Sequence, residues 1–229
     1  MSQTSSTKPL SKKTLAAACR SLAGSEPIFR RVYETYGTPP LWNRPPGFPT
    51  LLQIILEQQV SLASAKACFD KLTNRLGEIT PDRLLTLNDT ELKTIGFSRQ
   101  KTLYARHLSE AILEGRIDLD QLARLPDAEV KMELIKLKGV GEWTSDIYLL
   151  MALLRPDVMP KGDIALHAAF QKLTGLDARP KSDEFIGMAE QWKPFRSVAA
   201  RLLWHFYLNE SPTRRIMRES RANGRPGVQ

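Results

Sequence analysis

One stretch of the sequence places two glycines just before the start of an expected helix. In "LKGVGEWTSD" (residues 137–146), Gly139 and Gly141 flank a single valine. Glycine reaches positive φ without steric cost and has no side chain, so backbone amides at both positions can approach another molecule closely. The helix that follows adds unsatisfied N–H groups and the positive end of its dipole. These groups can hold an anionic oxygen such as a DNA phosphate, or the glycines can simply end a helix in a plain turn.

Charged side chains near this turn fit the same chemistry. Lys136 and Lys138 add positive charge beside the glycines, and Asp163 follows in "MPKGDIAL". Aspartate is among the best N-cap residues, so Asp163 is expected to begin the next apolar helix. Capping is compatible with a second role, because a carboxylate at a helix start near a phosphate socket can face the nucleotide held there.

The elements that position these residues are expected to be helices. Thr80 before a proline predicts one helix start, Asn88 with Glu91 forms a capping box, and another helix follows Ser98 and ends near Gly115. Alternating strand patterns are nearly absent. We therefore expect an all-α protein of about nine or ten short helices. Apolar residues recur at intervals of three to four in the segments 62–76, 130–137, 143–154, 166–173 and 195–208.

A segment rich in proline and glycine divides the chain. "GTPPLWNRPPGFP" (37–49) is predicted to separate two lobes of a single helical unit. The expected parts are a central lobe that contains the helix–hairpin–helix, a second lobe built from two segments, and a disordered stretch at each end. Their bounds are about 48–155 for the central lobe, 127–154 for the helix–hairpin–helix, 11–47 and 156–215 for the second lobe, 11–215 for the whole unit, and 1–10 and 216–229 for the ends.

Composition sets limits on the location and the partners. The formal charge of +8 lies at the two ends of the 229-residue chain, which favours a polyanion partner, although basic tails are more often solvated ends. Cys19 and Cys68 are too few for a disulfide framework, which favours a reducing compartment. No apolar run approaches the roughly 18–20 residues of a membrane span, and the start of the chain does not resemble a secretion signal. We expect a cytoplasmic or nuclear protein that does not bind membranes.

Three segments in order resemble one known family. "LLQIILEQQVSLASAKACFDKL", "LKGVGEWTSDIYLLMALLRPDVMPKGDIAL" and "WKPFRSVAARLLWHFY" are similar to the helix–hairpin–helix DNA glycosylase superfamily, in particular its 3-methyladenine DNA glycosylase II branch. The similarity runs from about residue 45 to 210. It implies a two-lobed helical glycosylase fold, with no room here for the N-terminal β domain of some members. It also implies an enzyme that flips a damaged nucleotide out of double-stranded DNA before removing its base.

The resemblance gives Asp163 a catalytic role. Loss of the base leaves a sugar with oxocarbenium character, which a nearby carboxylate stabilises, and the same group can orient or deprotonate the attacking water. Trp143 and Trp204 match pocket walls on which a cationic alkylated purine would gain a cation–π interaction. Ile147 stands where relatives carry a third aromatic residue, and Tyr148 is adjacent. From the residues alone, a tryptophan on a helix is more often part of the core.

The resemblance also assigns contacts to DNA. Gln59 matches the wedge that fills the gap left by the flipped nucleotide, with Gln58 and Ser61 beside it. Some relatives carry an apolar residue there, and the alternative for Gln59 is a plain polar residue at a helix end. Carbonyls of Ile135, Leu137 and Val140 match positions that hold a monovalent cation in similar proteins. The hairpin residues assigned to DNA binding are Lys136, Leu137, Lys138, Gly139, Val140, Gly141 and Thr144.

Missing residues narrow the chemistry further. Bifunctional relatives carry a lysine in patterns like GVGxK that forms a Schiff base with the sugar, and this position is Trp143 here. We therefore expect a monofunctional, monomeric glycosylase of the 3-methyladenine and 7-methylguanine type, with no cofactor and no catalytic metal. Two alternatives stay open. One is a non-catalytic helix–hairpin–helix module that only binds DNA, and the other is a glycosylase for deaminated or oxidised bases.

Overall fold

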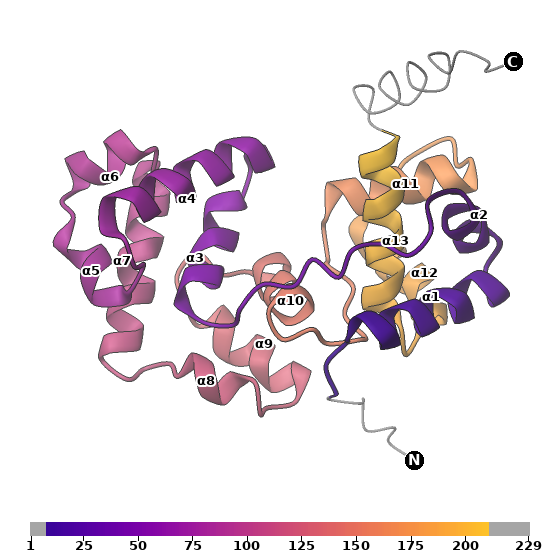
Figure 1. Cartoon of the computed structure of the whole chain (residues 1–229), viewed down its shortest axis with the longest axis horizontal. Helices are drawn as coiled ribbons and strands as arrows, with labels where there is room; N and C mark the ends of the chain where they lie inside the picture. The colour runs from indigo at the N-terminus through magenta and orange to yellow at the C-terminus, as the bar shows by residue number, and fades with distance from the viewer. Residues whose placement is uncertain (1–7, 211–229) are drawn as a thin grey trace, which may run out of the picture. The chain divides into compact units, whose positions relative to one another are not determined.

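The computed structural model describes residues 8–210, and in this range the chain is helical (Figure 1). It holds thirteen α-helices, one 3₁₀ helix and no strand in the part described. The expectation of an all-α fold is confirmed, but nine or ten helices was too few. Segments of four to eight residues, such as Leu119–Leu122 and Ser182–Ala189, complete too few turns to show an apolar stripe in the sequence.

The described chain divides into two compact units. Unit 1 holds Leu10–Leu41 and 156–210, and unit 2 holds Trp42–Arg155 together with Lys8 and Pro9. The helices of unit 1 are α1 (Lys12–Ser25), α2 (Pro27–Tyr36), α11 (Ile164–Thr174), α12 (Ser182–Ala189), η1 (Glu190–Trp192) and α13 (Arg196–Asn209). Those of unit 2 are α3 (Phe48–Glu57), α4 (Leu62–Leu76), α5 (Pro81–Thr86), α6 (Asp89–Ile95), α7 (Arg99–Leu113), α8 (Leu119–Leu122), α9 (Asp127–Ile135) and α10 (Glu142–Met151). The chain leaves unit 1 after Leu41, within the predicted dividing segment, and returns after Arg155.

Unit 1 is built around α13, which contacts α1, α2 and α11. Every residue from Ser197 to Trp204 is buried, including Arg201. The Arg201 guanidinium donates hydrogen bonds to the carbonyls of Leu41 and Ser197, and burial lowers its pKa to about 10. A buried cation is tolerated only when its N–H groups are satisfied, so these bonds hold the end of the first segment of unit 1 against α13.

Unit 2 is built around α3, which contacts α4, α7 and α10. The caps that the sequence predicts are present: the Thr80 hydroxyl accepts from Arg83 N–H, Asn88 and Glu91 form a capping box, and Ser98 caps α7. Each cap satisfies donors that would otherwise be unpaired at a helix start. None of the helices found in residues 8–210 has both the length and the apolar composition to span a bilayer.

The two ends of the chain lie mostly outside the described residues. This applies to residues 1–7 of the expected N-terminal stretch, to 211–215, and to the whole expected tail 216–229. Within the described part, Leu10 is buried although we expected it in a disordered end. Ser11 explains the difference, because it starts α1 with a capping box and so brings the preceding leucine against the core of unit 1.

Candidate active site

One glycine of the hairpin between α9 and α10 has a positive φ. Gly139 has a φ of +87°, and a Cβ built there would overlap the ring of Tyr104 from α7. Gly141 has a φ of −105°, so only one of the two glycines uses the positive φ that the sequence allowed. A Cβ on Gly141 would meet nothing within 4 Å. The backbone there is open to another molecule, while Gly139 is required by its conformation and by its neighbour.

Some backbone N–H groups of the hairpin have an acceptor within the described residues, and others have none. Lys138 N–H donates to His107 Nδ1 over 3.2 Å, and Val140 N–H donates to the Leu137 carbonyl over 3.1 Å. The N–H groups of Gly139 and Gly141 make no hydrogen bond to any residue in 8–210. Donors left open beside a helix start are the groups that bind an anionic oxygen.

The two hairpin lysines differ in their surroundings. Lys136 Nζ binds both carboxylate oxygens of Glu133 at 2.7 Å, so its charge is already partly neutralised. Lys138 is exposed and has no acidic partner among the described residues. The side chains of Leu137 and Val140 are buried, which leaves only their backbone atoms for a ligand. Lys138 is therefore the stronger candidate for a phosphate contact, and the monovalent cation at the carbonyls of Ile135, Leu137 and Val140 stays a prediction.

The turn between α3 and α4 lies against the hairpin. Gln58 Nε2 donates to the Gly139 carbonyl and to Thr144 Oγ1, both over 2.8 Å. Gln59 is exposed, with a φ of +56°. Ser61 Oγ accepts from Ser64 N–H and caps α4. The structure thus brings together three of the predicted DNA-binding residues, although Thr144 is buried and its hydroxyl already accepts a hydrogen bond.

Asp163 caps α11 in unit 1, and a tryptophan fixes the same carboxylate. Asp163 Oδ1 accepts from Leu166 N–H over 3.0 Å and from Trp204 Nε1–H over 3.2 Å. Both side chains belong to residues that are only 9% exposed. The indole has a single N–H, so this bond turns the edge of Trp204 toward the carboxylate. The result is a carboxylate of fixed orientation at the start of a helix, with the cap that the sequence predicted in place.

The remaining pocket candidates lie on α10 in unit 2. Trp143 is half-buried in the first turn, and Ile147 is buried in the core. Tyr148 is completely buried, its hydroxyl accepts from Gly47 N–H over 3.0 Å, and burial raises its pKa. Ile147 and Tyr148 therefore contribute to the packing of unit 2. The assignment of these three side chains to a base pocket stays a prediction.

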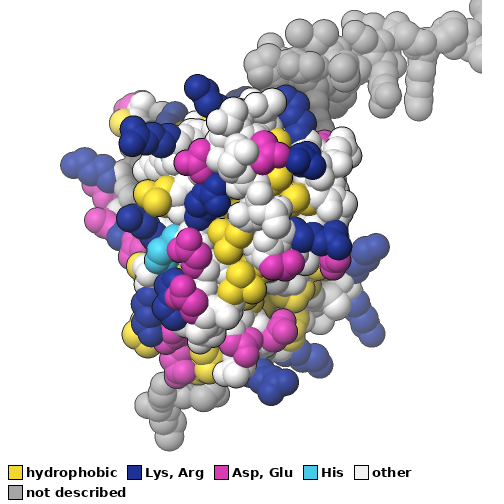
Figure 2. Space-filling model, turned by 90° about the vertical axis from the view of Figure 1, so that its left-hand side faces the viewer, with side chains coloured by type: hydrophobic (Ala, Val, Ile, Leu, Met, Phe, Trp, Pro, Cys, Tyr) yellow, Lys and Arg dark blue, Asp and Glu magenta, His cyan; other side chains and the backbone are white. Residues whose placement is uncertain are grey.

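Charges on one end of unit 2 are interspersed and paired. Figure 2 shows Lys, Arg, Asp and Glu side chains mixed over the end that carries α5 and α6, with no continuous basic surface. The ion pairs on α4, α6 and α7 include Lys66–Asp70, Arg75–Glu91 and Arg106–Asp89. Because neighbouring acids neutralise the basic groups of this face, the hairpin and its turn are the better candidates for contact with a polyanion.

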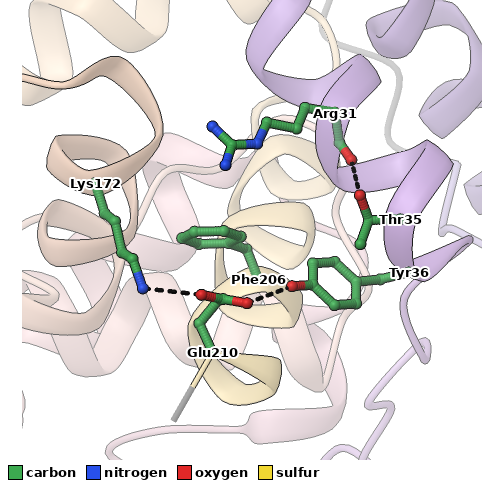
Figure 3. Close-up of a pocket in the computed structure, with 6 residues that line it drawn as sticks. All are labelled: Arg31, Thr35, Tyr36, Lys172, Phe206 and Glu210. Atoms are coloured by element: carbon green, nitrogen blue, oxygen red, sulfur yellow. Dashed lines mark hydrogen bonds and ion pairs between the residues drawn. The ribbon is translucent and has the colours of Figure 1, made fainter. Parts of the chain in front are cut away.

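A hollow in unit 1 was not foreseen from the sequence (Figure 3). Its volume is about 230 Å³, and it holds none of the predicted site residues. The Glu210 carboxylate accepts from the Tyr36 hydroxyl over 2.6 Å and from Lys172 Nζ over 2.9 Å, so the central charges are already paired. The lining residues are Arg31, Thr35, Tyr36, Lys172, Phe206 and Glu210. In addition, no group of three or more His, Cys, Asp or Glu side chains within residues 8–210 could hold a metal ion.

Comparison with protein families gives one match that covers most of the chain. The family described as HhH-GPD superfamily base excision DNA repair protein matches residues 52–194. That range contains the turn after α3, the hairpin and Asp163, but not Trp204. The matched segment thus includes residues from both units.

Several curated proteins are similar in sequence. DNA-3-methyladenine glycosylase 1 of Schizosaccharomyces pombe is 29% identical over 161 residues, which are 69% of this chain and 71% of the relative. DNA-3-methyladenine glycosylase 2 of Escherichia coli is 28% identical over 176 residues, which are 69% of this chain and 57% of the relative. YfjP of Bacillus subtilis is 28% identical over 181 residues, and the chain spans 63% of its length. The chain is thus matched over about two thirds of its own length and spans just over half of the bacterial relatives.

Among solved structures, the Schizosaccharomyces pombe 3-methyladenine DNA glycosylase Mag1 in complex with abasic DNA superposes with a TM-score of 0.75. It is 27% identical, and the match covers 82% of this chain and 95% of that one. The Archaeoglobus fulgidus 3-methyladenine DNA glycosylase has a TM-score of 0.71 at 18% identity, which supports the fold alone. The sequence match and the backbone match with Mag1 therefore agree on the fold.

Proposed function

Since the chain belongs to the HhH-GPD superfamily of base excision DNA repair proteins, we propose that it is a monofunctional DNA glycosylase for alkylated purines. The observation that carries this proposal is the Asp163 carboxylate, held by Leu166 N–H and Trp204 Nε1–H at the start of α11. A helix cap needs only the first of these donors, and the second fixes the carboxylate further. The relatives named as 3-methyladenine glycosylases support the class of substrate.

DNA binding is assigned to the hairpin and the turn of unit 2. The open N–H groups of Gly139 and Gly141 would hold one phosphate oxygen, and the exposed ammonium of Lys138 would add charge. Gln59 extends from the neighbouring turn and would fill the gap that a flipped nucleotide leaves in the stack. These contacts use the DNA backbone and a vacated base position, so they carry no preference for sequence.

Bond cleavage is assigned to Asp163. As the bond between sugar and base breaks, positive charge develops at the sugar carbon, and a carboxylate in a partly water-excluded site stabilises it. The attacking water gives its oxygen to this carbon, its proton passes to Asp163 or to solvent, and the bonding electrons leave with the base. An alkylated purine already carries a positive charge and departs neutral, so no general acid is required. Stacking on Trp143 or Trp204 would favour this cationic base over a normal one.

The absence of strand cleavage follows from one position. The residue that would form a Schiff base in GVGxK relatives is Trp143, which has no amine. The product would be free base and an intact strand with an abasic site.

The proposal is tested with a duplex that carries a single methylated purine. We expect the protein to release the methylated base, which is measured by chromatography, and to leave the strand intact until alkali or heat is applied. Binding without base release would favour the module that only binds DNA. Strand breaks without alkali would overturn the monofunctional assignment. A parallel duplex with a deaminated or oxidised base tests the remaining alternative, and preferred release from that duplex would replace the proposed substrate.

A further inference from the structure

One side-chain amide joins the turn after α3 to the hairpin before α10. Gln58 Nε2 has two N–H groups, and both are used, one on the Gly139 carbonyl and one on Thr144 Oγ1. The acceptors lie 81 and 86 positions further along the chain. Gly139 is in the hairpin and Thr144 is in the first turn of α10. One amide therefore fixes the turn to both parts of the hairpin motif.

The residue next to this amide has an uncommon backbone conformation. Gln59 has a φ of +56°, a region that residues with a side chain seldom occupy unless their surroundings hold them there. Val60 and Leu62 beside it are 45% and 63% exposed. The turn therefore presents two apolar side chains to solvent beside the proposed wedge. The side-chain hydrogen bonds of Gln58 are made by the residue directly before Gln59.

Helix α7 supports the turn and the hairpin from one side. Lys101 Nζ donates to the Leu56 carbonyl in the last turn of α3 over 2.6 Å. The Tyr104 ring occupies the space beside Gly139, and His107 Nδ1 accepts from Lys138 N–H. These three residues are spaced by three positions, so they lie along one side of α7. The hairpin and the turn thus share a common support within unit 2.

We propose that Gln58 is a positioning residue that sets the distance between the phosphate site of the hairpin and the wedge at Gln59. The inference rests on the proposed function and assigns Gln58 to the hairpin instead of to DNA. A phosphate held by the hairpin fixes the DNA backbone, and a rigid turn then places the wedge at one base step. Without the two hydrogen bonds of the Gln58 side chain, the phosphate site of the hairpin remains, but the wedge at Gln59 moves relative to it.

Base extrusion is the step that this coupling serves. Extruding a paired nucleotide costs unpairing and unstacking energy, whereas a base without a partner is extruded more easily. A misplaced wedge should therefore slow the removal of a paired lesion far more than that of an unpaired one. A merely structural role of Gln58 would affect both lesions equally.

The test uses Gln58→Glu, which keeps the size of the side chain but replaces both N–H donors with acceptors. Two duplexes carry the same methylated purine, one opposite its normal partner and one opposite an abasic analogue. We expect single-turnover base release from the paired duplex to fall about 10–100-fold, as expected for a displaced group, and release from the unpaired duplex to stay within about 3-fold. Because the new carboxylate lies beside the hairpin, affinity for DNA should fall to a similar extent for both duplexes, so the rates are compared at saturating enzyme. Gln121→Glu, at an exposed position of α8, is the control for the added charge.

Equal losses on the two duplexes would overturn the inference, as would a wild-type rate on the paired one. If Gln58→Glu does not fold, Thr144→Val removes one of the two acceptors. Its loss of rate should again be larger on the paired duplex than on the unpaired one, but smaller in size. Extrusion is also followed without chemistry, by the fluorescence of 2-aminopurine placed at the lesion position. Extrusion that depends on Gln58 without any base release by the wild type would overturn the proposed function and keep the inference. Base release by the wild type, with extrusion that does not depend on Gln58, would keep the proposed function and overturn the inference.

Discussion

The two candidate centres are built from different atoms. In unit 2, the hairpin offers backbone N–H groups in an exposed turn, and the Tyr104 side chain only packs against that backbone. In unit 1, the proposed reactive group is itself a side chain, and two donors on one oxygen of Asp163 fix its orientation at 9% exposure. Backbone donors recognise any phosphate, whereas an oriented carboxylate acts on one atom. Binding and bond cleavage should therefore respond to different substitutions.

The largest effect is expected for Asp163→Asn. Asparagine is also a good N-cap and keeps a side-chain oxygen for Leu166 N–H and Trp204 Nε1–H, so the fold should persist. Removal of the negative charge should lower the single-turnover rate of base release by about 10²–10⁴-fold. Affinity for the same duplex, measured by fluorescence anisotropy, should stay near the wild-type value. A comparable fall in affinity would mean that the centre in unit 1 also serves in binding.

Gly139→Val should lower the affinity for DNA and leave the rate of base release by the bound enzyme unchanged. A side chain at a φ of +87° is strained, and it would also displace the Tyr104 ring, so the open N–H groups of the hairpin should lose their alignment. We expect affinity for DNA of any sequence to fall about 10–100-fold, the value of one hydrogen bond to a charged group. Gly24→Ala in α1 is the control, because Gly24 is not among the glycines with a positive φ and a Cβ there would meet nothing within 4 Å. Equal losses in the two variants would contradict the role of Gly139.

Trp204→Phe tests whether the hydrogen bond from the indole to Asp163 contributes to the rate of base release. Phenylalanine keeps an aromatic ring but removes the N–H that binds Asp163 Oδ1, so the carboxylate should be less well oriented. We expect the rate of base release to fall about 3–10-fold, in line with the loss of one hydrogen bond. Trp192→Phe is the control, because Trp192 Nε1 is buried with no hydrogen-bond partner among the described residues. That control should lower the thermal midpoint without changing the rate of the folded enzyme.

The smallest effect concerns the stability of unit 1 in mild acid. Burial holds the pKa of His167 below its usual 6.5, against the opposing effects of its bond to the Pro180 carbonyl and of Asp163. The unfolded chain therefore takes up a proton first, and stability is lost as the pH falls from about 6.5 through the lower folded pKa. Urea unfolding at pH 7.5 and 5.5 should show a smaller loss for His167→Gln than for the wild type. If the wild type and His167→Gln lose the same free energy of unfolding between the two pH values, His167 is not responsible for the acid sensitivity.

Short-range features were predictable from the sequence, and long-range ones were not. The caps at Thr80, Asn88 and Ser98 were predicted because each depends on residues within one turn. The family was recognised from three segments and is confirmed by the match over 52–194. The bonds from Gln58 to Gly139 and Thr144 join residues more than 80 positions apart. No local pattern distinguishes such an amide from one that faces DNA.

Asp163 and Trp204 illustrate the same limit. Their types and the resemblance predicted two separate roles, a carboxylate and a pocket wall, but not a hydrogen bond between them. The register of α13 against α11 decides whether the indole edge reaches the carboxylate, and that register depends on how both helices pack in unit 1. Gly141 shows the same limit in the backbone. A glycine at this position allows a positive φ, but its φ in the hairpin is −105°.

The central claim, that Asp163 breaks the bond while the hairpin binds the DNA, is tested most directly by one crossed experiment. Asp163→Asn and Gly139→Val are compared on the same methylated duplex, with the rate of base release measured as a function of enzyme concentration up to saturation. We predict that Asp163→Asn loses rate at saturation and keeps the concentration of half-saturation. Gly139→Val should raise that concentration and keep the rate. A wild-type rate at saturation in Asp163→Asn would contradict the account.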